Sequence, residues 1–388
     1  MSVAVSTLAR QLEKLDAASP GTGTTQEYFI NMGPQHPSTH GVLRLVLRLD
    51  GETVKQVVPV LGYIHRGIEK MGEKLGYRQF IHLSDRIDYL SAMMNNWAVS
   101  LAVERAAGIE ISPRAQVIRT LMAELQRIQS HQLWWGVFGM DCGAITPFLY
   151  GFRDRELITD IFEETAGARL TMNYIQPGGV MFDLHPDFVA KTKAFIQYFR
   201  PKLDEYDTLL SGNVIFQERL RNVGVMSGAD AVSFGTTGPI LRASGVSLDL
   251  RRDEPYGAYG QAKFEVPVGR TGDSWDRYWV RVEEMRQSLN IIEQLIDQIP
   301  DGKHMVLKSA VKIKLPEGTH YSQVETARGI LGVLIVSDGK DSKPYRIHLR
   351  TPCFNNLWAI TAIAPGWRLA DLVAILSSFD IVVPDIDR

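Results

Sequence analysis

The chain has 388 residues, of which 45% are hydrophobic and 22% are charged, as in an ordinary globular protein of roughly two or three domains. Its 42 basic and 44 acidic residues give a formal net charge of −2, so we expect no nucleic-acid partner. The two cysteines, Cys142 and Cys353, cannot provide the four thiolates of an iron–sulfur cluster and form no CxxC pair. A metal redox centre would therefore belong to another chain.

The N-terminal segment, residues 1–26, predicts a flexible arm. It lacks the charged-then-apolar order of a secretory signal, and ASPGTGTTQ is typical of a linker. The longest aliphatic stretch, residues 330–336, is far shorter than the roughly 20 residues that span a bilayer. We therefore expect a cytoplasmic chain without a transmembrane span.

Residues 27–72 predict an N-terminal β region. Apolar residues surround Arg44 and Arg48 before an Asp50-Gly51 turn, which is the pattern of a β-hairpin.

Residues 73–211 predict a helical bundle. Between residues 73 and 107 the apolar side chains recur at spacings of three and four, which favours one long helix. Ser112-Pro113 and Thr146-Pro147 each match an N-cap followed by proline at the first helical position. Gly167 is a candidate C-terminal cap, and a further helix is expected over residues 185–210.

The remaining chain divides into three parts. Residues 212–272 are rich in glycine and proline and predict an irregular segment, whereas residues 273–300 resume helical spacing as a long helix. Residues 301–388 predict a mixed α/β region, with strands at VKIKL, GVLIV and YRIHL and a short helix at residues 367–376. The expected fold class is α+β, with a helical bundle at its centre.

Candidate chemistry begins with GPQHPSTHG, because neither a GxxxxGK[ST] loop nor a strand-to-helix GxGxxG is present to bind nucleotide phosphates. His36 and His40 are four residues apart but separated by Pro37, so they belong to a turn rather than to one helical face. They either brace that turn or form a metal pair that would need further ligands.

Two further side chains have alternative interpretations. Tyr89 lies on a polar stripe of the predicted helix at residues 73–107, either as a core aromatic with a satisfied hydroxyl or as a proton donor. Asp141, in GMDCGAITP, either caps the next helix or requires a hydrogen-bonded partner among apolar neighbours.

Ordered sequence blocks extend over nearly the whole chain: GPQHPSTHGVLRL, LGYIHRGIEK, DRIDYLS, GMDCGAITPF, GARL followed by PGGV, GPILRASG and FDIVVPDIDR. Together they resemble the quinone-site subunit of respiratory complex I, known as the 49 kDa or D subunit, and its photosynthetic H-subunit relatives. That family is related to the large subunit of nickel–iron hydrogenases, whose two metal-binding CxxC pairs are missing here. The resemblance implies a hydrogenase-like scaffold with a quinone headgroup in the former metal pocket.

The resemblance also implies roles for individual residues. Tyr89 and His40 are expected to be hydrogen donors to the headgroup, and Asp141 is expected to orient or recharge His40. His36 and Ser91 are expected to line the quinone pocket. A reduced quinone needs protons and stabilisation of its developing negative charge, which tyrosine and histidine can supply.

The implied assembly is a proton-translocating NADH:quinone oxidoreductase that is active only when complete. Arg66 and Arg86 match arginines near the terminal iron–sulfur cluster of the small-subunit homologue, which is the expected partner with other peripheral-arm and membrane subunits. The quinone is a substrate, and the chain is expected to hold no metal or flavin of its own. It would lie on the cytoplasmic face of the energy-transducing membrane.

Three positions depart from the family pattern. Asn96 stands where a glutamate is usual, Gln176 replaces an arginine, and Thr171 with Met172 occupies a site where many relatives have histidine. A titrating histidine there would couple the cluster potential to pH, so this coupling is not expected here. The absence of the glutamate weakens the case for a charged relay through Asn96.

A second function from another class remains open. The chain could be a scaffold subunit of a related membrane-bound hydrogenase or ferredoxin-oxidising complex, without quinone at this site. The presence of both Tyr89 and His40 favours the quinone, and the missing cysteines exclude a free-standing hydrogenase. The donors would serve ubiquinone, menaquinone and plastoquinone alike, and the electrons could come from NADH, NADPH or ferredoxin.

Overall fold

A computed structural model of the chain describes residues 27–39, 41–308 and 312–388. The predicted arm at residues 1–26 and the candidate donor His40 lie outside these residues. Helices predominate, and small antiparallel sheets lie near each end of the chain, so the α+β fold class is confirmed.

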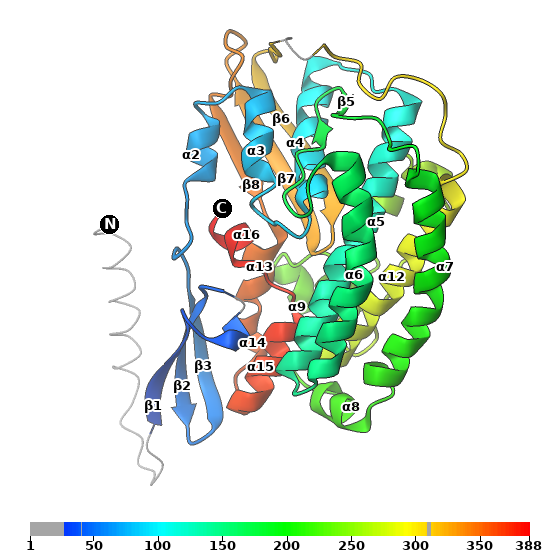
Figure 1. The fold of residues 1–388 in the computed structure, drawn as a ribbon. Helices are drawn as coiled ribbons and strands as arrows, with labels where there is room; N and C mark the ends of the chain where they lie inside the picture. Colours follow the sequence, from blue (N-terminus) through cyan, green and yellow to red (C-terminus); the bar gives the residue numbers. More distant parts are fainter. Residues whose placement is uncertain (1–26, 40, 309–311) are drawn as a thin grey trace.

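The N-terminal sheet contains β1 (Glu27–Met32), β2 (Arg44–Asp50) and β3 (Thr53–Val60), paired antiparallel in that order. The predicted hairpin is confirmed, because Asp50 pairs with Thr53 across the turn. Figure 1 shows this blue sheet beside the red C-terminal helices α14 (Ile360–Ile363) and α15 (Leu369–Ser378), both of which contact β3. Residues 27–60 and the C-terminal helices therefore share one packed region.

The central bundle follows the predicted order, and its helices stand side by side in Figure 1. It comprises α4 (Ala92–Ala107), α5 (Pro113–Asp141), α6 (Ile145–Ala166), α7 (Phe188–Tyr206) and α12 (Ser274–Leu295). The Ser112 side chain accepts a hydrogen bond from the Ala115 amide, so the predicted N-cap of α5 is confirmed. Gly167 ends α6 with a φ of 76°, as a left-handed C-terminal cap does.

The single helix predicted over residues 73–107 is wrong. After α2 (Ile68–Gly72), the chain forms α3 (Tyr77–Ser84) and α4, with a non-helical break at residues 85–91. At the break, Asp88 Oδ1 accepts a hydrogen bond from the Leu90 amide at 3.1 Å. Aspartate and serine side chains compete for backbone donors in this way and interrupt helices. The apolar period continues across the break because both helices bury their faces in one core.

The predicted start of the next helix is also wrong. Helix α6 begins at Ile145 with Ala144 as its N-cap, and no side chain caps it, so Thr146 lies inside the helix. Pro147 is tolerated at the third helical position because the first four amides of a helix have no intrahelical acceptor. Asp141 does not cap α6.

The segment at residues 212–272 is irregular, as predicted. It contains only short helices among the described residues, namely α8 (Val214–Leu220), α9 (Gly228–Ser233), α10 (Pro239–Ala243) and α11 (Leu250–Asp253), with a 3-10 turn at Tyr259–Gln261. Helix α7 continues into a π-helical turn at Asp207–Ser211. The long helix predicted next is confirmed as α12.

The C-terminal sheet contains β6 (Gly318–Thr326), β7 (Gly329–Ser337) and β8 (Arg346–Arg350), and α4 packs on it. GVLIV falls in β7 and residues 346–349 of YRIHL fall in β8. Residues 312–315 of VKIKL are not a strand, so that prediction is wrong. Strand β6 was not predicted because its sequence, GTHYSQVET, is mostly polar. Its Glu325 is buried in an ion pair with Arg242 instead of packing on an apolar face.

The C-terminal region also contains α13 (Pro352–Trp358) and α16 (Val383–Asp387), which the sequence did not predict. The expected helix at residues 367–376 is confirmed as α15. Within the described part of the chain, none of the helices has both the length and the apolar character needed to cross a membrane.

Candidate functional site

The break between α3 and α4, which we call the 85–91 segment, places one exposed aromatic between buried polar neighbours. Asp88 is 2% exposed and Ser91 is fully buried, whereas Tyr89 is 36% exposed. Desolvation of the phenol raises the pKa of Tyr89, and the nearby carboxylates of Asp88 and Asp380 act in the same direction. The positive charge of Arg328 lowers it. Tyr89 is therefore not a core aromatic.

Helix α15 and the residues just after it contact Asp141, Arg328 and the pocket of His36. Ser377, near its end, donates a hydrogen bond to Asp141 Oδ2 at 2.6 Å, so the end of α5 is tied to α15. Just beyond α15, Asp380 pairs with Arg328, which also pairs with Asp88. The first turns of α15 border a pocket that His36 lines.

His36 lies in the loop between β1 and β2 and is exposed. Its Nδ1 accepts a hydrogen bond from the Ser38 amide at 3.2 Å, which leaves Nε2 as the protonated nitrogen of the neutral ring. The adjoining pocket has a volume of about 400 Å³ and is also lined by Met32, Leu369 and Val373. His36 thus braces its turn and faces a mainly apolar pocket.

Arg66 and Arg86, both expected near the partner's cluster, lie beside each other in the structure. An Arg66 guanidinium nitrogen donates to the Arg86 carbonyl at 2.7 Å, and Arg86 donates to the His82 carbonyl at 2.5 Å. Burial of its side chain and the charge of Arg86 lower the pKa of Arg66. Two exposed positive charges therefore lie beside the start of the 85–91 segment.

Asp85 lies in the same segment. Among the described residues, no group donates a hydrogen bond to its Oδ1 atom. The carboxyl is buried, and its nearest cation is the Arg86 guanidinium at 3.9 Å. Desolvation raises the pKa of Asp85 to about 6. A carboxyl with such a pKa can change its charge near neutral pH.

Ser91 and the family departures Asn96 and Met172 are buried in the protein. The Ser91 hydroxyl receives a hydrogen bond from Arg328 at 3.3 Å, so it lies beneath the segment that carries Tyr89. Asn96 is buried, accepts from Ser84 and donates to the Met172 carbonyl. Thr171 and Gln176 are partly buried. The neutral Asn96 amide thus both accepts and donates a hydrogen bond, at a position where a glutamate would bring a negative charge.

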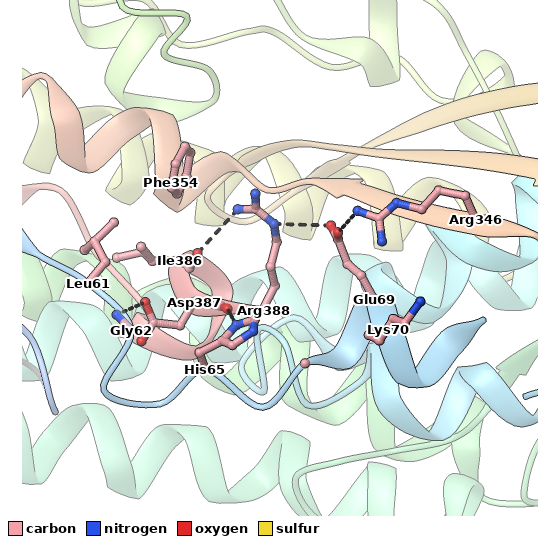
Figure 2. Close-up of a pocket in the computed structure, with 11 residues that line it drawn as sticks. Leu61, Gly62, His65, Glu69, Lys70, Arg346, Phe354, Ile386, Asp387 and Arg388 are labelled. Atoms are coloured by element: carbon pink, nitrogen blue, oxygen red, sulfur yellow. Dashed lines mark hydrogen bonds and ion pairs between the residues drawn. The ribbon is translucent and has the colours of Figure 1, made fainter. Parts of the chain in front are cut away.

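A second cavity, of about 440 Å³, lies where LGYIHRGIEK meets the last residues of the chain. Figure 2 shows Asp387 accepting from the Gly62 amide at 2.8 Å, while its carbonyl lies 2.6 Å from His65 Nδ1. Arg388 and Arg346 both pair with Glu69. Two blocks that are more than 300 residues apart in the chain therefore form one charged cavity.

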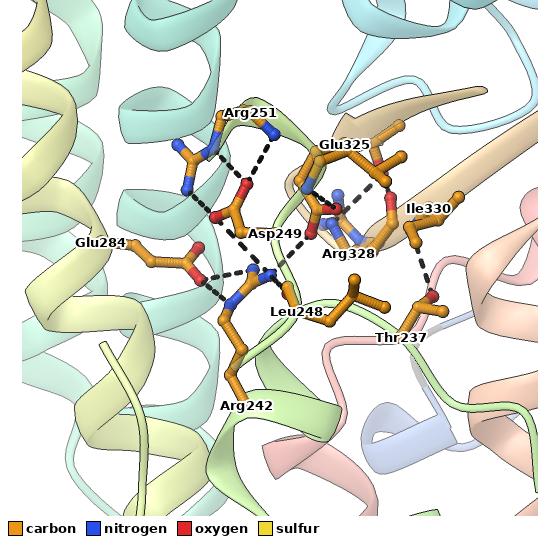
Figure 3. A network of polar contacts seen from close by, with 12 residues as sticks. Thr237, Arg242, Leu248, Asp249, Arg251, Glu284, Glu325, Arg328 and Ile330 are labelled. Carbon is orange, nitrogen blue, oxygen red and sulfur yellow. Dashed lines mark hydrogen bonds and ion pairs between the residues drawn. The ribbon is translucent and has the colours of Figure 1, made fainter. Parts of the chain in front are cut away.

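A group of buried charges that does not include Tyr89 lies between α5, α12 and β6. We call it the arginine–carboxylate network, and it contains Glu124, Arg127, Arg242, Asp249, Arg251, Glu284 and Glu325. In Figure 3, Arg242 reaches Glu284 at 2.6 Å and Glu325 at 2.8 Å. Tyr259 and Ser288 both donate to Glu124 at 2.6 Å.

Sequence patterns missed the charged residues near Tyr89, namely Asp88, Arg328 and Asp380, and gave no role to Asp85 in the same segment. Each stands in an apolar block, in DRIDYL, TARGIL or FDIVV, where a charge requires a partner. That signal marks them as paired or functional but does not reveal which residues pair. Among the described residues, no group of three or more histidine, cysteine, aspartate or glutamate side chains could hold a metal ion.

Comparison with known proteins gives consistent matches. Residues 141–314 and 304–388 match the family described as respiratory-chain NADH dehydrogenase, 49 Kd subunit. Over 363 residues, 94% of this chain, it is 51% identical to the C/D subunit of NADH-quinone oxidoreductase from Bacteroides fragilis, of which the match covers 68%. The same share of the chain is 48% identical to the D subunit from Desulforamulus reducens and 47% identical to that from Bacillus mycoides, covering 99% of each.

Proposed function

This chain belongs to the family of the 49 kDa subunit, or D subunit, of respiratory-chain NADH dehydrogenase, and we propose that it supplies the proton donors of that enzyme's quinone site. The observation that carries the proposal is the partly exposed ring of Tyr89, which lies near the buried charges of Asp88, Arg328 and Asp380. Helix α15, which precedes Asp380, contacts Asp141 and borders the pocket of His36.

In this proposal the quinone headgroup receives two electrons from an iron–sulfur cluster of the small-subunit homologue and two protons from this chain. Tyr89 and His40 donate to the two carbonyl oxygens, and Asp141 is the counter-ion that keeps His40 protonated. His36 and Ser91 belong to the pocket lining. Donors that are fixed in place stabilise the charge that develops on the oxygens as electrons arrive.

The assembly follows from the same proposal. Arg66 and Arg86 face the partner's cluster, where their positive charge favours its reduced state. The chain is a peripheral subunit on the cytoplasmic side of the membrane. It acts only in the complete NADH-oxidising, proton-translocating complex, since it supplies neither the nucleotide site nor the cluster.

Replacing Tyr89 with phenylalanine tests the proposal in the assembled complex. The variant keeps the ring but loses the proton donor, so quinone reduction should fall about 100- to 1000-fold, the loss typical of removing one charge-stabilising donor. Cluster reduction by the upstream donor should continue. Tyr259→Phe is the matched control, because it removes a buried hydroxyl bonded to Glu124 and should leave turnover per assembled enzyme unchanged.

Parent-rate quinone reduction in the Tyr89→Phe enzyme would reject the donor role. In that case the alternative, a scaffold subunit of a related hydrogenase or ferredoxin-oxidising complex without quinone at this site, would become the better explanation. The composition of the purified complex separates these further, because a nucleotide-binding flavoprotein subunit indicates NADH as the electron source.

A further inference from the structure

Arg328 lies in the turn between β6 and β7 and is 1% exposed. Its Nη1 atom donates to both carboxylate oxygens of Asp88, at 2.9 and 3.2 Å, and also approaches the hydroxyl of Ser91 at 3.3 Å and that of Ser130 at 3.0 Å. Its other two nitrogens donate to Asp380, Nε to the carbonyl and Nη2 to Oδ1, each at 3.0 Å. Every nitrogen of the guanidinium is therefore engaged.

Two of the residues that accept hydrogen bonds from Arg328 flank Tyr89 in the sequence. Asp88 is the residue before the tyrosine and Ser91 is two residues after it. Ser130 belongs to α5, and Asp380 follows α15, so one side chain ties the 85–91 segment to two separate elements. A planar guanidinium fixes several acceptors in direction as well as in distance, which a lysine ammonium does not do.

The backbone at Asp380 supports the same interpretation. Its φ of 55° lies in the left-handed region, which is unusual for a residue other than glycine, although aspartate and asparagine tolerate it best. Two hydrogen bonds from Arg328 hold this residue. Residues kept in such conformations cluster at functional sites.

Arg328 also influences the charge around the phenol. The charged groups that face Tyr89 are Arg328 from the β6–β7 turn, Asp88 from its own segment and Asp380 from the C-terminal tail. Arg328 also interacts electrostatically with the buried carboxyl of Asp385. Burial and the charge of Asp88 raise the pKa of Asp385 to about 7. Buried Cys353 donates its backbone amide to Asp385 at 2.9 Å.

We propose that Arg328 is a positioning residue for quinone reduction, which fixes the 85–91 segment so that the Tyr89 hydroxyl meets the headgroup. The inference rests on the proposed donor function of Tyr89. Arg328 itself is buried and touches neither the quinone nor the reacting atoms.

A purely structural arginine would behave differently, and the chain offers a matched control. Arg119 is also buried, pairs with Glu104 at 2.7 Å and donates to the Gly179 carbonyl. It has no contact with the 85–91 segment. Arg119→Lys and Arg328→Lys therefore make the same chemical change to two buried ion pairs, only one of which adjoins Tyr89.

The test compares both variants in the assembled complex, with turnover normalised to assembled enzyme and a short-chain quinone as substrate. In Arg328→Lys the charge remains but one nitrogen cannot serve four acceptor residues, so kcat should fall on the order of a hundredfold, the cost of misplacing a catalytic group by about 1 Å. The KM should change little, because the lost interaction acts in the transition state. In Arg119→Lys, kcat per assembled enzyme should equal the parent value.

A double variant shows whether Arg328 acts through the tyrosine. Adding Arg328→Lys to Tyr89→Phe should cause no further fall in kcat, whereas a second, multiplicative loss would overturn the inference. Parent kcat in the single Arg328→Lys variant would overturn it as well, with the donor role of Tyr89 intact. Parent kcat in Tyr89→Phe would reject the proposed function, and the inference with it.

If the Arg328→Lys variant does not assemble, Asp380→Asn provides a second test of the positioning role of Arg328. Asparagine tolerates the left-handed backbone and keeps the carbonyl that Arg328 binds, but removes one negative charge that faces Tyr89. The pKa of Tyr89 should then fall, so the alkaline limb of kcat should move to lower pH while kcat at neutral pH drops several-fold. An unmoved limb with parent kcat would overturn the inference.

Discussion

The 85–91 segment and the arginine–carboxylate network both place charges inside this protein, but they treat them differently. In the network, each carboxylate is bonded to a guanidinium, a hydroxyl or an amide, and all seven side chains are fully or almost fully buried. In the segment, Tyr89 is partly exposed and Asp85 Oδ1 is left without a hydrogen bond among the described residues.

The difference predicts how each region responds to substitution. A buried ion pair with complete hydrogen bonding is costly to break and specifies how the surrounding elements pack. Polar groups that remain unpaired or exposed reduce stability and are retained where chemistry needs them. We therefore expect changes in the network to act on stability and changes in the segment to act on turnover.

The largest expected effect is in the network. Glu284→Gln removes the charge that pairs with Arg242 and contacts His131, so the variant should lose about 3–5 kcal/mol of stability. Arg242 holds the pKa of Glu284 well below its usual value despite burial. The stabilisation is therefore present above the unfolded pKa of about 4.3 and is lost as pH falls, and this acid dependence should weaken in the variant.

Thermal unfolding of the purified complex at several pH values, together with the recovered amount of the chain, measures this change. Arg169→Gln is a suitable control, because Arg169 pairs with exposed acidic residues on α6 and should change stability by at most about 1 kcal/mol. Equal losses in the two variants would show that Glu284 contributes no more to stability than an exposed ion pair does.

A smaller loss is expected from Tyr259→Phe. Its hydroxyl donates to the charged Glu124 at 2.6 Å, and hydrogen bonds to charged groups contribute about 1.5–3 kcal/mol. Tyr89→Phe should leave the unfolding midpoint unchanged. Measuring both midpoints by calorimetry sharpens the comparison. Tyr259→Phe should lower stability and leave turnover unchanged, whereas Tyr89→Phe should lower turnover and leave stability unchanged.

Asp85→Asn should change stability in the opposite direction. The folded pKa of Asp85, about 6, exceeds its value of 3.8 in the unfolded chain, so the folded state binds the proton more tightly. The ionised group thus destabilises the protein above pH 6, and the cost disappears as pH falls through this window. The variant should gain on the order of 2 kcal/mol at pH 7 and lose this pH dependence. A loss of stability at pH 7 would show that Asp85 is fully paired.

The smallest effect is expected from Asp141→Asn. The Ser377 hydroxyl can still donate to the amide oxygen, so packing between α5 and α15 should survive. Loss of the counter-ion proposed for His40 should reduce quinone turnover about tenfold, equivalent to about 1.4 kcal/mol, and first at alkaline pH. Turnover measured against pH checks this, and reduced assembly with a parental pH profile would assign Asp141 a structural role.

Local chemistry made part of the fold predictable. Ser112 and Gly167 cap helices where the sequence placed them, and the Asp50-Gly51 turn joins β2 and β3, because such signals depend on a few neighbouring residues. The same rules failed at the 85–91 segment, whose apolar spacing continues while its backbone leaves the helix. A residue from another element, Arg328, holds that break.

For the candidate site, the sequence by itself determined the family blocks and singled out Tyr89, Arg66 and Arg86 as candidate residues. Only the tertiary structure decided that Tyr89 is exposed and Ser91 is buried, and that Asp141 meets Ser377 rather than capping α6. Chain neighbours within three or four positions fix caps and turns. The partner of a buried charge is instead set by which distant elements pack together, and no pattern along the chain records that pairing.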